Sequence, residues 1–146
     1  MSMTGLTQFD QTIHLTNTWL NEIMEELGWE DRHRAYRGLR AVLHALRDRL
    51  PVESAAHLAA QLPMLVRGFY YEGWAPGKEH VRDRTANDFV AHVEQAFSQD
   101  PDAEPERIVD AVFGLLNRHV SDGEVKNVRS NLPEAIRSLW PVNEAV

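Results

Sequence analysis

The sequence predicts an all-α protein: two tandem four-helix repeats, about eight helices, packed as one pseudo-two-fold helical domain. Three observations predict this fold. Apolar residues recur three and four positions apart, no segment alternates as a strand does, and the second half repeats the first seventy residues on. Seven identities mark the repeat: Arg37, Ala41, Val42, Leu46, Leu62, Pro63 and Arg67 return as Arg107, Ala111, Val112, Leu116, Leu132, Pro133 and Arg137.

The first repeat is expected to occupy residues 1–76 and to contain four helices. The first helix and a second over residues 31–50 each carry one apolar stripe, because side chains three and four apart share a helix face. These stripes are Leu20, Ile23, Met24 and Leu27, then Tyr36, Leu39, Leu43, Leu46 and Leu50. Two shorter helices follow at about 52–61 and 63–72, separated at Leu62-Pro63, since proline is tolerated in a helix's first turn.

The second repeat, expected over residues 77–146, follows the same order. Its apolar stripes are Val90, Val93 and Phe97, then Val109, Val112, Leu116 and Val120. Its third helix, at about 122–131, is predicted to begin with a capping box, in which the side chains of Ser121 and Glu124 each satisfy a backbone N–H group. A last helix is expected over 133–140.

Composition and charge narrow the classes of function. The chain has 146 residues, enough for a self-sufficient core, and its net charge of −7 disfavours non-specific binding to nucleic acid. It contains no cysteine, which rules out disulfides and thiolate metal sites. No apolar run is long enough to span a bilayer, and Met1–Asp10 does not read as a secretory signal. We therefore expect a cytoplasmic protein without membrane contact. A C2 homodimer stays open on the sole ground that C2 dimers are the commonest oligomers of soluble proteins.

The repeat also separates structural from functional candidates. A residue present in both halves is more readily explained by the fold, whereas a residue present in one half is a candidate for function. Arg67 and Arg137 lie at matching positions after the two Leu-Pro pairs. We expect both arginines to tie helix ends or loop carbonyls together.

A polar stripe on the predicted second helix is the main candidate for binding. Its members are spaced four, three, four and three residues apart and therefore share one helix face: His33, Arg37, Arg40, His44 and Arg47. The segment 31–50 holds six arginines and two aspartates, and only the first arginine of the stripe is kept in the second repeat, as Arg107. Such a face suits an acidic partner, a phosphorylated ligand or nucleic-acid phosphate. Alternatively, these arginines pair with the protein's own acids, such as Glu22, Glu25 and Glu26.

An aromatic segment over Phe69–Lys78 is the second candidate. Aromatic residues with polar atoms are enriched at recognition surfaces, which adds Tyr71 and Trp74 to the binding candidates. The same residues would also serve as a plug between two packed halves of the molecule.

No catalytic or metal motif stands out. Glu30 and His33 form one Glu-x-x-His pair, but a di-iron bundle needs two, and the second repeat has Asp100 and Ala103 instead. We therefore assign no catalytic residue, metal ligand or cofactor. Whether the protein is an enzyme stays open, with a non-enzymatic role preferred.

Two long stretches carry a family resemblance. They are Asp31-Arg32-His33-Arg34-Ala35-Tyr36 with the helix that follows, and Ala60-Gln61-Leu62-Pro63-Met64-Leu65-Val66-Arg67-Gly68-Phe69-Tyr70-Tyr71-Glu72-Gly73-Trp74. Over about residues 13–141 the chain resembles bacterial proteins of the domain-of-unknown-function family 2267. The resemblance implies an all-α, cytosolic, prokaryotic protein, and it implies no activity and no residue role.

The favoured function is thus a non-enzymatic, cytoplasmic interaction module that binds an acidic macromolecular partner. The first alternative is a small-molecule-binding or metal-dependent enzyme that uses a groove between the repeats. Nucleic-acid binding is the third.

Overall fold

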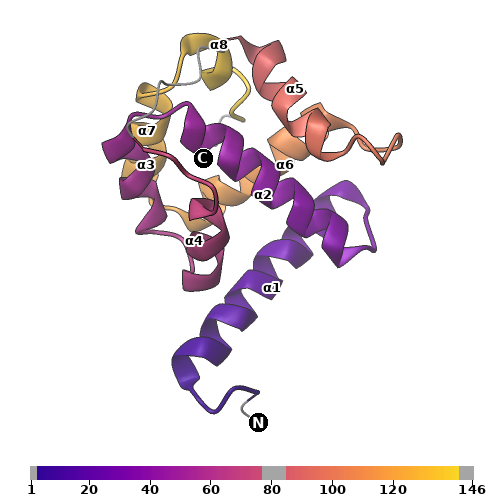
Figure 1. Ribbon diagram of the computed structural model, residues 1–146, viewed down its shortest axis with the longest axis vertical. Coiled ribbons are helices and arrows are strands. Elements are labelled where there is room, and N and C mark those ends of the chain that lie inside the picture. The colour runs from indigo at the N-terminus through magenta and orange to yellow at the C-terminus, as the bar shows by residue number, and fades with distance from the viewer. Residues whose placement is uncertain (1–2, 77–84, 142–146) are drawn as a thin grey trace, which may run out of the picture.

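The computed structural model describes residues 3–76 and 85–141, and this part of the chain is all-α, as predicted (Figure 1). Its helices are α1 (Thr7–Leu27), α2 (Arg32–Asp48), α3 (Val52–Ala59), α4 (Met64–Tyr71), α5 (Ala86–Ala96), α6 (Pro105–His119), α7 (Asp122–Ser130) and α8 (Glu134–Arg137). Within these two ranges there is no β-strand. The all-α prediction is therefore confirmed, while the tandem arrangement and the division at residue 76 stay predictions.

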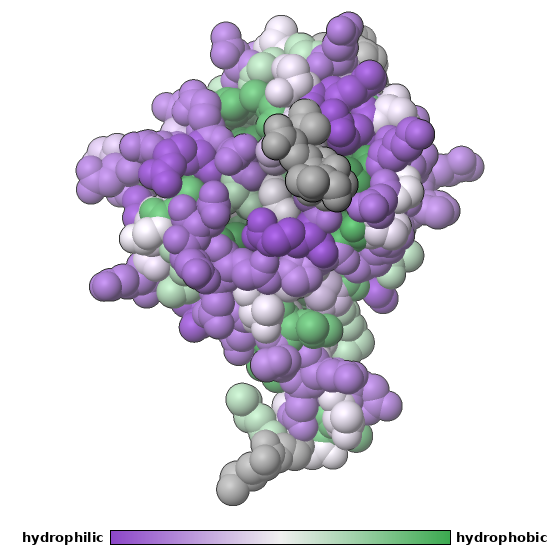
Figure 2. All heavy atoms as spheres, turned by 180° about the vertical axis from the view of Figure 1, so that it is seen from behind, coloured by the Kyte–Doolittle hydropathy of each residue, from purple (hydrophilic) through white to green (hydrophobic). Residues whose placement is uncertain are grey.

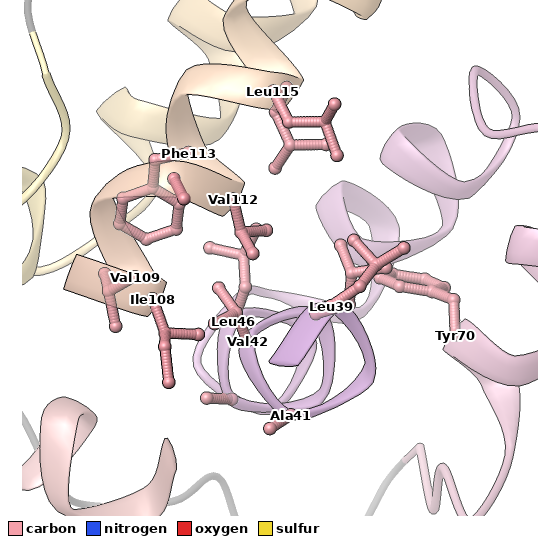
Figure 3. Packing of buried hydrophobic residues seen from close by; sticks show 14 of the residues in the cluster. Leu39, Ala41, Val42, Leu46, Tyr70, Ile108, Val109, Val112, Phe113 and Leu115 are labelled. Atoms are coloured by element: carbon pink, nitrogen blue, oxygen red, sulfur yellow. The ribbon is translucent and has the colours of Figure 1, made fainter. Parts of the chain in front are cut away.

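Helix α2 is central to the packing. It contacts α1, α4, α5 and α6. Its apolar residues face several directions: Val42 lies towards Ile108 and Val112 of α6, and Leu39 lies on the side of Tyr70 (Figure 3). Gly38 allows a close approach, since a Cβ there would stand 3.1 Å from the Ile108 side chain. Apolar and small residues from Ala35 to Leu46 are buried on several sides of α2, so its neighbours enclose the helix over much of its length although it also carries polar residues.

One hydrophobic cluster contains residues from all eight described helices. Leu46 is fully buried, as its position in the apolar stripe of residues 31–50 predicts, and Trp19 of α1 is 2% exposed. Tyr70 is also fully buried, and its hydroxyl donates to the Ala55 carbonyl over 2.7 Å. Burial raises the pKa of this phenol, so Tyr70 stays neutral.

Helix α1 projects from this core. Its N-terminal part extends away from the body of the molecule, and its C-terminal part packs against α2 and α6 (Figure 1). The helix ends at Gly28, whose φ of 69° is the left-handed conformation that glycine adopts without strain. Seen from behind, most of the surface is hydrophilic, with an apolar patch where the projecting end meets the body (Figure 2).

Helices α3 and α7 pack against each other. The capping box predicted at the start of α7 forms only in part. Ser121 caps α7 as expected, because its hydroxyl accepts from the backbone N–H of Glu124. The return bond of the capping box is not formed. The backbone N–H of Ser121 donates instead to the side chain of Gln61, and the Glu124 carboxylate lies 3.1 Å from the His57 ring.

The last helix is shorter than predicted. The sequence suggests a helix over 133–140, but α8 comprises Glu134–Arg137. Turn hydrogen bonds continue from Leu139 to Ile136 and from Trp140 to Arg137. Pro141 follows directly, and because a residue before proline is disfavoured in the helical conformation, the turns do not continue as helix beyond Trp140.

Arg67 and Arg137 have the structural role expected of them. Each guanidinium donates to backbone carbonyls that precede its own helix. Arg67 binds those of Ala59 and Leu62, and Arg137 binds those of Arg129 and Leu132; Arg67 makes a further, longer bond of 3.5 Å to Ala60. The two matching pairs of acceptors are seventy residues apart, which supports the proposed duplication.

Candidate functional site

The polar stripe of α2 divides into a buried half and an exposed half. His44 is 9% exposed and Arg47 is 5% exposed, whereas His33 is exposed and Arg37 and Arg40 are half-buried. One face of a helix therefore meets two environments along its length. The two halves have different chemistry.

The buried half of the stripe caps the end of α4. His44 Nε2 lies 2.6 Å from the Phe69 carbonyl oxygen, and Arg47 Nη1 donates to the carbonyls of Tyr70 and Glu72 over 2.9 Å and 2.7 Å. The last carbonyls of a helix have no partner within the helix, so Arg47 satisfies those of Tyr70 and Glu72. His44 adds a second donor to the Phe69 carbonyl, which also accepts from the backbone N–H of Glu72. Arg47 also donates from Nε to Asp48 over 2.9 Å. This geometry favours a structural role for His44 and Arg47.

Burial also fixes the state of His44. Removal from water lowers the pKa of His44 because it disfavours the charged imidazolium, and the charges of Arg47 and Arg40 lower it further. The hydrogen bond to Phe69 and the charge of Asp48 act in the opposite direction. His44 is therefore neutral near pH 7, and its Nε2–H donates to the carbonyl.

The exposed half of the stripe opens on a hollow of about 520 Å³ between α2 and α5, which we call the basic hollow. Its lining is largely polar and includes the predicted residues His33, Arg37, Arg40 and His44. It also includes residues that were not predicted as binding candidates, namely Tyr36, Ala41, Glu72, His92, Gln95 and Ala96.

The two arginines of the basic hollow are only loosely neutralised. Arg40 Nε lies 3.5 Å from Glu72, and the two side chains are 41% and 56% exposed, so water weakens this ion pair. The Arg37 guanidinium lies over the Phe97 ring at 5.6 Å. Among the described residues Arg37 forms no direct ion pair, although its charge adds to that of Arg34 in lowering the pKa of Asp100. Both guanidiniums thus retain donors for an added carboxylate.

Two arginines of the stripe pair with acids of the chain, Arg40 with Glu72 and Arg47 with Asp48, but Glu22, named above as an alternative partner, is engaged elsewhere. Glu22 binds Arg118 and His119 of α6, over 2.8 Å and 2.6 Å, and the His119 ring stacks on Trp19. Burial raises the pKa of Glu22, but the hydrogen bonds and charges of Arg118 and His119 outweigh it and lower the pKa overall. Glu22 therefore joins α1 to α6 and does not neutralise the stripe.

The aromatic pair lies beside the hollow and not in its wall. Tyr71 and Trp74 stack with ring centroids 5.2 Å apart, and both are partly buried against the core. Glu72, between them in sequence, is the residue of this segment that reaches the hollow. Gly77 and Lys78, the end of the predicted segment, lie outside the described residues.

A second hollow, of about 1040 Å³, lies between α1, α4 and the start of α2, and we call it the apolar groove. Its apolar walls are formed mainly by Phe9, Ile13, Leu20, Met64, Leu65 and Phe69. Three of these side chains are open to solvent: Phe9 is 46% exposed, and Met64 and Leu65 are 45% exposed each. The apolar groove and the basic hollow share His33, Tyr36 and Glu72 in their linings, so they are adjacent.

The apolar groove was not predicted from the sequence. The available signal was the apolar pair Met64-Leu65 directly after Pro63, together with Phe9 and Ile13 four residues apart. Apolar residues at such spacing are normally assigned to a core. Only the projection of α1 shows that nothing in the described chain covers this end of α1 and α4.

Neither a metal centre nor a membrane span is found where the structure is described. No group of three or more His, Asp or Glu side chains in these ranges could hold a metal ion. None of the described helices is long and apolar enough to cross a membrane.

Comparison with known proteins identifies the family. Residues 16–139 match the model of a family described as "Uncharacterized conserved protein (DUF2267)". No curated protein matches the chain. Because the match covers most of the sequence, the chain belongs to the DUF2267 family.

Proposed function

We propose that this protein is a non-enzymatic helical module that binds an acidic protein partner in the cytoplasm of a prokaryotic cell. The basic hollow carries the proposal: His33, Arg37 and Arg40 gather at the surface of a chain whose net charge is −7. A positive patch on an acidic protein selects partners of the opposite charge and speeds their approach.

The chemistry of the hollow suits carboxylates. Arg37 and Arg40 stand one helical turn apart on α2, and each planar guanidinium can bind a carboxylate with two parallel hydrogen bonds. A partner carboxylate on Arg40 would compete with Glu72 at 3.5 Å, a long and solvent-screened contact. Replacing Glu72 by a partner carboxylate at Arg40 therefore costs little, and carboxylates bound at both Arg37 and Arg40 form two intermolecular ion pairs.

The experiment is affinity capture from the native cells followed by mass spectrometry. We expect an acidic protein to be captured by the natural chain and lost with Arg37→Glu/Arg40→Glu. The matched control is Arg107→Glu/Lys126→Glu, which changes the charge equally on exposed side chains of the second half. Binding reconstituted from the purified pair should weaken as salt rises, because salt screens exposed charges.

Two results would contradict the proposal. One is capture that survives Arg37→Glu/Arg40→Glu as well as it survives the control. The other is capture abolished by nuclease, which would point to nucleic acid. Circular dichroism of each variant shows that the helices are intact.

Small-anion binding is the second candidate function. The volume of the basic hollow, about 520 Å³, is within the range of small-molecule sites. Titration with inorganic phosphate, followed by calorimetry, tests it directly. Saturable heat that disappears with Arg37→Glu/Arg40→Glu would favour this candidate over a protein partner.

A further inference from the structure

We infer that the apolar groove receives the apolar face of an amphipathic, acidic helix belonging to the partner. This inference rests on the proposed function, because it describes how the same acidic partner is bound. The inference is supported by the position of the uncovered apolar groove beside the basic hollow, since both are lined by His33, Tyr36 and Glu72.

The walls of the apolar groove are shaped for a helix. One wall is the projecting part of α1 with Phe9 and Ile13, and the other is α4 with Met64 and Leu65. An amphipathic helix binds such a groove through apolar residues at i, i+3 or i+4, and i+7. The eight residues of α4 span about 12 Å, which matches the length of two helical turns.

The two walls are held in place before any partner binds. The hydroxyl of Thr12 on α1 accepts a hydrogen bond from the backbone N–H of Leu65 over 2.8 Å. Thr12 is 8% exposed and therefore forms part of the floor. Tyr36 and Phe69 pack edge to face, with ring centroids 5.1 Å apart, at the other end of α4. A preformed groove lowers the entropic cost of binding.

Charge complementarity selects an acidic helix. The charged groups that line the apolar groove or the basic hollow include three arginines and one glutamate: Arg32, Arg37, Arg40 and Glu72. Arg32 hydrogen-bonds to Asn21 over 2.7 Å and to Asn17 at 3.5 Å, and neither amide neutralises its charge. A helix with apolar residues on one face and Glu on the other would place its carboxylates beside these guanidiniums.

Solvent exposure shows what the helix would cover. Phe9, Met64 and Leu65 are each almost half exposed although they line a groove. Contiguous apolar surface of this kind on a soluble chain marks a site of association. Burying the three side chains would contribute most of the affinity, while the arginines set specificity and the rate of association.

The test uses a labelled synthetic peptide of about 16 residues, roughly four helical turns, with Leu at i, i+3, i+4 and i+7 and Glu on the other face. Two further peptides serve as controls: one with the same composition in scrambled order, and one with Lys in place of Glu. Fluorescence anisotropy is measured with the full chain. We expect saturable binding of the acidic amphipathic peptide, at least about tenfold tighter than either control.

Two matched variants locate the binding. Met64→Glu puts a charge in the apolar groove, and Val52→Glu makes the same change outside it. Met64 and Val52 each follow an N-capping proline, Pro63 and Pro51, and their exposures are similar, 45% and 42%. We expect Met64→Glu to weaken binding about tenfold or more and Val52→Glu to change it less than about twofold, because only Met64 lines the groove.

The outcomes separate this inference from the proposed function. Peptide binding lost with Arg37→Glu/Arg40→Glu but unchanged by Met64→Glu would overturn the groove inference and leave the acidic partner supported. A second pattern has the same meaning: the peptide does not bind, but a cellular partner is captured and its capture needs Arg37 and Arg40. This pattern would also overturn the groove inference and leave the acidic partner supported. Failure of both would overturn both proposals.

Other occupants of the groove would also overturn the inference. Sedimentation of the natural chain tests for a second copy, and a dimer abolished by Met64→Glu but not by Val52→Glu would assign the groove to self-association. Flotation with phosphatidylglycerol vesicles tests for lipid. Vesicle binding that is abolished by Met64→Glu but not by Val52→Glu, in a chain that shows no preference for the acidic peptide, would assign the groove to a membrane surface.

Discussion

At the scale of single residues, the stripe on α2 shows how neighbours decide the role of a side chain. His33, Arg37, Arg40, His44 and Arg47 share one helix face, as their spacing predicts. The return of α4 buries the last two, and the first three stay at the surface. Periodicity along one helix carries no information about where another helix crosses it. The sequence therefore predicts the face but not the division between its structural and its accessible half.

Arg47 tests this division. Replacement by Ala would leave the carbonyls of Tyr70 and Glu72 without their donor, so Arg47→Ala should lower the free energy of unfolding by about 2–4 kcal/mol. Arg40→Ala, which removes an exposed ion pair, should change it by less than about 0.5 kcal/mol. Urea unfolding gives both values. Equal losses for the two variants would show that the stripe is not divided in this way.

His44 gives a prediction of pH dependence. Its pKa in the folded state is below the ordinary value of 6.5, mainly through burial, so the unfolded chain binds the proton more readily. The contribution of neutral His44 to stability is complete above pH 6.5 and is lost as the pH falls through the folded-state pKa. Urea unfolding between pH 7.5 and 5.5 should therefore show a steeper loss for the natural chain than for His44→Gln. Identical pH profiles would contradict a buried, neutral His44.

At the scale of elements, the ends of the helices are where sequence and structure differ most. The Ser121 cap is present as predicted, but the Gln61 side chain, from another part of the chain, takes the N–H that Glu124 was expected to bind. Local sequence can suggest a cap, whereas a long-range competitor appears only in the folded molecule. The same reasoning applies to α4: Met64 and Leu65 look like core residues in sequence, yet they line an open groove.

The end of α1 provides a test at this scale. Gly28 has a φ of 69°, where an L-residue is strained, so Gly28→Ala should destabilise the protein by about 1–2 kcal/mol. Gly68→Ala is the contrasting change, because Gly68 lies inside α4 and an added Cβ meets no atom within 4 Å. It should stabilise by up to about 1 kcal/mol. Thermal unfolding of both variants would contradict this account if their effects had the same sign.

At the scale of the whole molecule, the seventy-residue register is both the strongest sequence signal and a proposal still to be tested. Arg67 and Arg137 make matching bonds, and the apolar stripes of both halves enter one cluster. The halves differ at the accessible residues of α2, where Arg40 corresponds to Asp110 and His33 to Ala103. This difference between the halves indicates α2 as the candidate binding helix. It could not reveal the apolar groove, since that depends on how far α1 extends beyond α4.

Duplication predicts equal costs at equivalent positions. Arg67→Ala and Arg137→Ala each remove the same two short hydrogen bonds to backbone carbonyls, and Arg67→Ala also removes a weak one of 3.5 Å. Each variant should therefore cost about 1–3 kcal/mol, and the two values should agree within about 1 kcal/mol. Urea unfolding of the two variants measures both. A large loss for one and none for the other would show that the matched bonds do not reflect matched roles.

The most direct measurement of the central claim is an NMR titration of the isotope-labelled chain with the acidic amphipathic peptide. We expect the backbone amide shifts to concentrate in three segments: 9–17 of α1, 33–40 of α2 and 64–69 of α4, which border the apolar groove and the basic hollow. At the same peptide concentration below saturation, these shifts should be much smaller in Met64→Glu, whose binding is weakened, and unchanged in Val52→Glu. Shifts centred on α3 and α7, or none at saturating peptide, would contradict a binding surface formed by the groove and the hollow.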